Sequence, residues 1–86
     1  MTMSDEGLKN LKVDKVVDAR GTACPGPLLE AKRSMTQVQV GGTMEVLSSD
    51  VGTKKDIPLW ANKVGHEFLG ILEGPSYSRI FVRRGK

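Results

Sequence analysis

The only cysteine of the chain, Cys24, lies in the sequence Gly-Thr-Ala-Cys-Pro-Gly-Pro at residues 21–27. Apolar residues typical of a strand precede this stretch and a helical pattern begins at Leu28, which predicts a loop that leads from a strand into a helix. Pro25 and Pro27 suit the first turn of that helix, because proline fixes φ and the N–H group that it lacks would have no partner there. Unpaired N–H groups at a helix start stabilise an anion, and the thiolate is the reactive form of cysteine. The stretch therefore predicts a nucleophilic Cys24 with a lowered pKa.

A purely structural cysteine is the alternative. A free cysteine is among the most often buried residue types and behaves as a small apolar residue. Core cysteines usually lie within apolar periodic runs, whereas Cys24 lies among glycines and prolines. That context favours the reactive interpretation.

The other residues that could take part in chemistry are few. One cysteine and one histidine cannot supply the four ligands of a structural zinc site, so we expect neither a metal nor a cofactor. His66 has two interpretations: a base for Cys24, or a residue just past a helix end that interacts with the last carbonyl groups, which is favoured. Trp60 lies on an apolar helical stripe and is expected in the core rather than at a partner surface.

The elements that must position Cys24 follow from the hydrophobic periodicity. Helices are expected over residues 25–38 and from about Asp56 to 64, although an earlier start at Thr53 is left open. Gly65 supplies the left-handed residue that commonly ends a helix. Strands are expected over residues 14–20, 43–48, 66–72 and 77–84. The order is βαβαββ, and right-handed crossovers predict a two-layer α/β (α+β) sandwich: a mixed four-stranded sheet with two helices on one face.

Length and composition set the remaining limits. The 86 residues form one small domain, which we expect over residues 13–86 after a disordered leader at residues 1–12. No stretch approaches the roughly 18 apolar residues of a membrane span, and the polar, acidic N-terminus does not resemble a secretory signal. A reactive free thiol suits a reducing compartment, so we expect a cytoplasmic protein without membrane contact.

The positive charge is concentrated at the C-terminal end. Residues 79–86 carry Arg79, Arg83, Arg84 and Lys86, while the other residues carry nine basic and ten acidic side chains. These arginines and Arg20 are candidates for docking an acidic partner protein, and RNA is a second candidate partner. The alternative is that the charges protect a strand edge against aggregation.

The chain resembles the TusA (SirA-like) sulfur-carrier family from about Val17 to Arg84. The family has an aspartate in its first strand, then a glycine, then Cys-Pro-x-Pro at the start of the first helix. These residues are present here as Asp18, Gly21 and residues 24–27. Further along, the matching residues are Asp50, the Asp-Ile-Pro sequence at 56–58, Trp60 and the Gly-His pair at 65–66. Two positions depart from the common pattern: Gly26, where some tRNA-pathway members have glutamate, and Val51, where proline is frequent.

The resemblance implies that Cys24 accepts sulfane sulfur from a desulfurase or a rhodanese and passes it to an acceptor protein. It implies a covalent carrier rather than a multiple-turnover enzyme, with Gly21, Pro25, Gly26 and Pro27 supporting the cysteine. Persulfide and thiosulfonate cargo, and service in tRNA thiolation or sulfur oxidation, all remain open. The alternative is an RNA-binding or regulatory module that uses the basic C-terminal strand, although few aromatic residues offer a stacking surface and direct binding to nucleic acid is not expected.

Overall fold

Four strands and three helices form in the residues that the computed structural model describes, 4–22 and 26–86. In chain order they are α1 (Asp5–Lys9), β1 (Lys15–Asp18), α2 (Gly26–Met35), β2 (Thr43–Ser48), α3 (Thr53–Val64), β3 (Glu67–Glu73) and β4 (Ser78–Arg83). The strands form one sheet in the order β1-β2-β4-β3, with β1 parallel to β2 and β4 antiparallel to both of its neighbours. The predicted mixed four-stranded sheet is confirmed.

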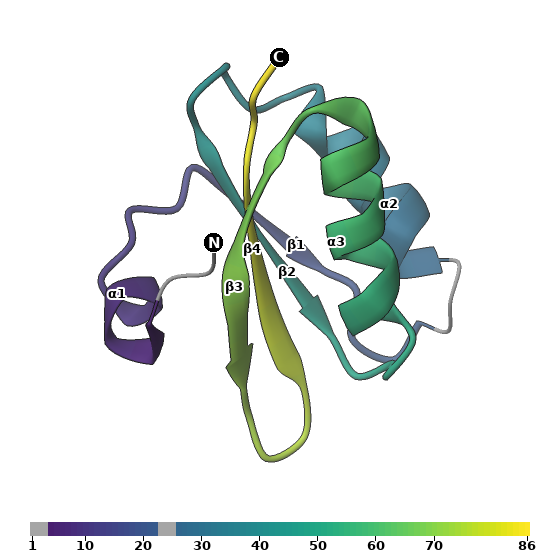
Figure 1. Ribbon diagram of the computed structural model, residues 1–86. Helices are drawn as coiled ribbons and strands as arrows, with labels where there is room; N and C mark the ends of the chain where they lie inside the picture. The colour runs from purple at the N-terminus through teal and green to yellow at the C-terminus, as the bar shows by residue number, and fades with distance from the viewer. Residues whose placement is uncertain (1–3, 23–25) are drawn as a thin grey trace.

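The helices α2 and α3 pack side by side against one face of the sheet, as predicted (Figure 1). Since β1, β2 and β3 run in the same direction, the two helices that connect them run the opposite way. Both helices therefore begin at the edge of the sheet where these three strands end. The core between the two layers consists of small and aliphatic side chains, namely Val17, Ala31, Met35, Val38, Met44, Val46, Ile57, Ala61, Ile80 and Val82.

The other face of the sheet carries a second, smaller apolar cluster beneath α1. Leu8 is 1% exposed and packs with Leu69, Leu72 and Phe81. The Ser4 hydroxyl accepts a hydrogen bond from the N–H of Gly7 and caps this short helix. Where the sequence predicted a disordered leader, the described part of residues 1–12 contains α1, whose Leu8 covers apolar side chains of β3 and β4 that would otherwise face water.

A bulge in β3 explains why this strand contributes to both clusters. The pairing with β4 shifts between Phe68 and Gly70, so that Leu69 is an extra residue. Phe68 and Ile71 consequently face α2 and α3, while Leu69 and Leu72 face α1.

The helix boundaries differ from the prediction in ways that the backbone explains. α3 begins at Thr53, the earlier of the two starts that the sequence left open, with Gly52 at the N-cap position. α2 ends at Met35, but the chain continues in a tighter turn in which the N–H of Val38 bonds the carbonyl of Met35, so Val38 still reaches the core. Gly65 ends α3 with φ 91°, as predicted.

Candidate functional site

The stretch that contains Cys24 is described at its two ends, residues 21–22 and 26–27; Cys24 and Pro25 lie outside the described residues. At the first end, the N–H of Ala19 bonds the carbonyl of Leu47 and so extends the pairing of β1 with β2 by one residue. The chain then turns, with the N–H of Thr22 bonded to the carbonyl of Ala19. Gly21 has φ 79°, a left-handed conformation that favours glycine.

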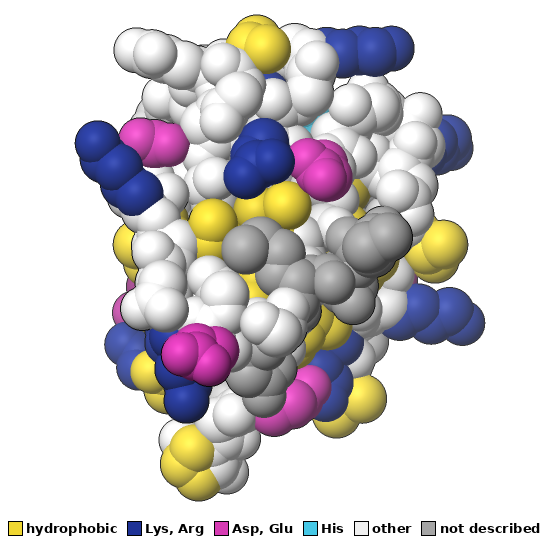
Figure 2. All heavy atoms as spheres, turned by 60° about the vertical axis from the view of Figure 1, so that its left-hand side comes forward, with side chains coloured by type: hydrophobic (Ala, Val, Ile, Leu, Met, Phe, Trp, Pro, Cys, Tyr) yellow, Lys and Arg dark blue, Asp and Glu magenta, His cyan; other side chains and the backbone are white. Residues whose placement is uncertain are grey.

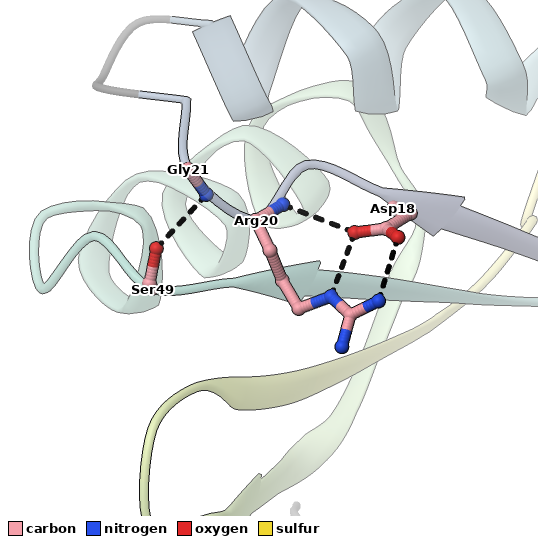
Figure 3. A network of polar contacts seen from close by, with 4 residues as sticks. All are labelled: Asp18, Arg20, Gly21 and Ser49. Carbon is pink, nitrogen blue, oxygen red and sulfur yellow. Dashed lines mark hydrogen bonds and ion pairs between the residues drawn. The ribbon is translucent and has the colours of Figure 1, made fainter.

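Arg20 is fixed by the strand that precedes it (Figure 3). Its Nε and Nη2 atoms donate to the two carboxylate oxygens of Asp18 at 2.9 and 2.8 Å, and its guanidinium lies 4.9 Å from the centre of the Tyr77 ring. These side-chain hydrogen bonds, followed by the one from the Arg20 N–H, lower the pKa of Asp18 to about 2. The guanidinium therefore points towards Asp18 in β1 and not towards the part of the loop that follows Gly21.

A hydrogen bond ties the β1–α2 loop to the loop between β2 and α3. The N–H of Gly21 donates to the hydroxyl of Ser49 at 3.1 Å (Figure 3). The second loop is shaped by Asp50, whose N–H bonds the Ser48 hydroxyl and whose carboxylate accepts from the N–H of Gly52 at 2.8 Å. Gly21, Thr22, Ser49 and Asp50 line an open cavity of about 260 Å³. The family aspartate Asp50 thus lies beside the residues that lead to Cys24.

At the other end of the stretch, Gly26 lies in close contact with Thr22. A Cβ atom on Gly26 would overlap the methyl group of Thr22, so glycine allows the two ends of the loop to approach each other. Pro27 is buried in the first turn of α2, as its position in the motif predicts. The described start of α2 is therefore only two residues after Cys24 and carries no acidic residue in its first turn.

The arginines predicted for partner docking are held by groups of the protein itself. Arg79 pairs with the buried Glu45, and Arg83 pairs with Glu67. Arg84 donates from Nη1 to the carbonyls of Met35 and Val38 at 3.2 and 2.6 Å, at the end of α2. On the face in Figure 2, basic and acidic side chains accordingly lie interspersed, without one sign predominating.

His66 lies at the opposite end of the helical layer from the start of α2. It follows the end of α3, about 18 Å along the helix axis from the first turn at 1.5 Å per residue. Its N–H bonds the carbonyl of Ala61, and its Nδ1 accepts from the N–H of Gly85. The alternative role as a base for Cys24 thus has no support from the described geometry. The preferred interpretation is correct for the backbone of His66, whereas its ring binds the C-terminal segment.

Trp60 occupies a position between the two predicted alternatives. It packs against the core but is only partly buried, and its ring meets that of His66 edge-on at 5.3 Å. Sequence reasoning missed Ser49 as a residue of the site. A hydroxyl residue directly after β2, next to the end of the parallel strand β1, is the signal that could have identified it.

Within the described residues, no group of three or more histidine, cysteine or acidic side chains could hold a metal ion. Among the helices of the same residues, none has the length and hydropathy to cross a membrane.

Comparison with known proteins identifies the family. The family model described as sulfurtransferase TusA matches residues 15–84. The chain belongs to the TusA family. A candidate sulfur carrier protein of Archaeoglobus fulgidus is 51% identical to this TusA-family chain over 71 residues, covering 83% of it and 97% of the relative. The sulfur carrier protein TusA of Pseudomonas putida strain GB-1 is 38% identical over 71 residues, covering 83% and 89%.

The crystal structure of the SirA-like protein from Desulfitobacterium hafniense has the same fold, with a TM-score of 0.73 and 22% sequence identity. The match covers 84% of this TusA-family chain and 99% of that protein. The names of the relatives support a sulfur-carrier role, in agreement with the resemblance that the sequence motifs indicated.

Proposed function

We propose that this protein carries sulfane sulfur on Cys24 as a persulfide and passes it to a partner protein. The observation that carries the proposal is the described start of α2 at Gly26, two residues after the only cysteine. The first N–H groups of a helix have no partner within the helix itself, and at the start of this ten-residue helix they favour a thiolate or persulfide anion. α3 begins at the same edge of the sheet and adds a second helix start.

The transfer needs no external oxidant or reductant. The Cys24 thiolate attacks the outer sulfur of a donor persulfide, a new S–S bond forms, and the donor thiolate leaves with the electron pair of the broken S–S bond. In the second step an acceptor thiolate attacks the outer sulfur on Cys24, and Cys24 leaves as a thiolate. A low pKa helps both steps, since Cys24 is first an ionised nucleophile and then the leaving group. No second cysteine of the chain competes by forming an internal disulfide.

The surroundings of the loop suit a reaction between two proteins. Gly21 and Thr22 are exposed, and the cavity that they share with Ser49 and Asp50 is open, so a partner active site can approach from this side. In this proposal Gly21, Gly26, Pro25 and Pro27 shape the loop, and the carrier acts stoichiometrically in the cytoplasm without cofactor or metal. A desulfurase or a rhodanese is the proposed donor, and the product serves tRNA thiolation or sulfur oxidation.

Intact-mass measurement tests the proposal directly. Incubation with a cysteine desulfurase and cysteine should add the mass of one sulfur atom, which a thiol reductant removes. The Cys24→Ser variant should gain nothing. Tetrathionate offers a second route, which should leave a thiosulfonate on the same residue. If no donor adds mass while Cys24 still reacts with iodoacetamide, the carrier proposal is wrong.

The RNA-binding alternative gains no support from the positions of its arginines, because Arg79 and Arg83 are paired with carboxylates. A filter-binding titration with salt distinguishes the two functions. Binding driven by phosphate contacts weakens steeply as the salt concentration rises, whereas sulfur loading from a small-molecule donor should not.

A further inference from the structure

A cavity of about 510 Å³ lies where α2 and α3 end, at the opposite end of the helical layer from the site described above. In Figure 1 this is the upper end of α3, near the C-terminus of the chain. Its volume lies in the range of ligand pockets, which is roughly 300–1,000 Å³. We name this cavity the α2–α3 groove.

The floor of the α2–α3 groove is apolar. Met35, Trp60 and Val64 line it, and Val64 is 40% exposed. The ring of Trp60 rests with one side on the core and is not fully covered. An apolar surface next to the core therefore remains exposed to solvent.

The rim of the α2–α3 groove is basic. It carries Lys32, Lys63, Arg84 and Lys86, and none of the described acidic side chains lines it. Within the described residues, no Asp or Glu side chain lies within ion-pair distance of the three lysines, although other basic side chains of the molecule do form such pairs. The side-chain carbons of Lys86 lie close to Gly65. Burial, together with the charges of Arg84 and Lys86, lowers the pKa of His66, which agrees with a positive potential in this region.

Cations near helix C-termini offset the helix dipole, and this accounts for the positions of Lys32 and Lys63 in the last turns of their helices. It does not account for the open apolar floor between them. The combination of such a floor with a basic rim matches a ligand that has an apolar group between negative charges.

Carboxylates fit this groove better than phosphates do. Phosphate sites commonly combine lysine with the N–H groups of a helix N-terminus or with the free fork of an arginine, whereas the helix ends here present carbonyl groups. Arg84 already donates to the carbonyls of Met35 and Val38 and to a main-chain oxygen of Lys86. The aromatic rings that line the groove, those of Trp60 and His66, meet edge-on, which suits a single apolar side chain better than the stacked bases of RNA.

We propose that the α2–α3 groove docks an acidic segment of a sulfur-transfer partner, with one apolar side chain on the floor and flanking carboxylates near Lys63 and Lys86. The proposal rests on the proposed carrier function, since a carrier must recognise the proteins that load and unload it. A segment bound here leaves the edge with the starts of α2 and α3 free for transfer.

Trp60 is the only tryptophan of the chain, so its fluorescence reports on the groove. The probe is a capped pentapeptide with phenylalanine between two pairs of acidic residues. It should change the Trp60 emission saturably, and the affinity should fall as salt is added. Lys63→Glu with Lys86→Glu should weaken binding about tenfold, because two favourable rim charges become repulsive. Val64→Asp, at an exposed position of the floor, should have a similar effect.

The matched control is Lys9→Glu with Lys12→Glu, which changes the net charge equally at two exposed positions outside the groove. It should bind the peptide as the wild type does, and circular dichroism verifies that each variant is folded. Equal weakening by both double variants, or no saturable change in emission, would overturn the proposal. So would a single-stranded oligonucleotide that binds more tightly than the peptide and is displaced by the same groove substitutions.

Sulfur transfer supplies an independent readout. With a protein donor, the Lys63/Lys86 double variant should load more slowly than the control double variant, while loading from tetrathionate should be equal in both. Because the peptide titration works equally well with Cys24→Ser, failure of docking and failure of the carrier function remain distinguishable. Equal loading rates of the two double variants with each of several protein donors would contradict the docking role.

Discussion

At the scale of single residues, Gly26 and Thr22 illustrate how the loop around Cys24 is closed. The methyl group of Thr22 occupies the space that a side chain at position 26 would need. The glycine at the variable position of the Cys-Pro-x-Pro motif is thus explained by its neighbour four residues earlier, and not by an unusual backbone angle, since its φ is not positive.

The contact between Thr22 and Gly26 predicts that Gly26→Ala changes the free energy of unfolding in opposite directions, depending on the residue at position 22. Gly26→Ala should destabilise the protein by about 1 kcal/mol, because the added methyl forces Thr22 to move. With Thr22→Ser, which removes the obstructing methyl, the same substitution should stabilise by roughly 0.4–1 kcal/mol through the lower entropy of the unfolded chain. Urea denaturation of the wild type, the two single variants and the double variant measures the four free energies of unfolding that this comparison needs. Equal effects of Gly26→Ala in both backgrounds would contradict the contact.

The second prediction at this scale concerns the pKa of Cys24. We expect it to lie below the free value of about 8.5, because the helix start at Gly26 stabilises the thiolate. The rate of iodoacetamide alkylation against pH, in the native and in the urea-unfolded protein, gives the two midpoints. Arg20→Gln should shift the native midpoint little, since that guanidinium is paired with Asp18. A native midpoint equal to or above the unfolded one would refute the role of the helix start.

At the scale of elements, α1 is the helix that the sequence patterns did not indicate. Five residues with one buried leucine show no periodicity, and a helix of this length is not stable by itself. Its stability comes from the contact of Leu8 with the face of β3 and β4. The bulge at Leu69 decides that Leu72, rather than Ile71, lies on this face.

Substitution of Leu8 measures what α1 contributes. Leu8→Ala should lower the free energy of unfolding by about 2–3 kcal/mol, near the lower end for a buried leucine because the cluster is small. Lys9→Ala, at the exposed neighbouring position, should change it by less than about 0.5 kcal/mol. Sulfur loading of folded Leu8→Ala should be normal, because α1 covers the face opposite to α2. A Leu8→Ala protein as stable as Lys9→Ala would mean that α1 does not pack in solution.

At the scale of the whole molecule, periodicity was sufficient to predict the four strands, both long helices and their common face. The ion pairs of Arg79 and Arg83 could not be predicted in this way, because they depend on which strands are neighbours and in what register. The same holds for the hydrogen bond between Gly21 and Ser49, which joins two loops that are 28 positions apart. The motif indicated the chemistry of Cys24. The α2–α3 groove could not be predicted from the sequence, because it forms where three separate segments of the chain meet.

The stability of the whole molecule should depend on pH in a defined way. Folding lowers the pKa of His66 through burial and nearby cations, and it lowers that of Asp18 to about 2 through the pairing with Arg20. The folded protein therefore binds fewer protons than the unfolded chain at both groups, and stability falls on acidification. The loss of stability due to His66 begins as the pH falls through about 6.5, the pKa of histidine in the unfolded chain. The loss due to Asp18 occurs between about pH 4 and pH 2.

Urea denaturation at pH 7, 5 and 3 checks this expectation. His66→Gln, whose amide oxygen can still accept from Gly85, should reduce the loss between pH 7 and 5, and Asp18→Asn should reduce the loss below pH 4. Equal stability of the wild type at pH 7 and 5 would show that the protonation of His66 costs nothing in the folded state.

The bulge at Leu69 has a consequence for the evolution of this chain. The extra residue shifts the alternation of side chains between the two faces of the sheet for the rest of β3. Leu72 therefore faces α1, and Ile71 faces α3. Deletion of Leu69 would only restore regular pairing with β4, whereas deletion of a residue after the bulge would turn each later side chain of the strand to the wrong layer. The β3–β4 hairpin should therefore accept substitutions far more readily than changes in length, and tolerated insertions should cluster beyond Glu73, where the strand has ended.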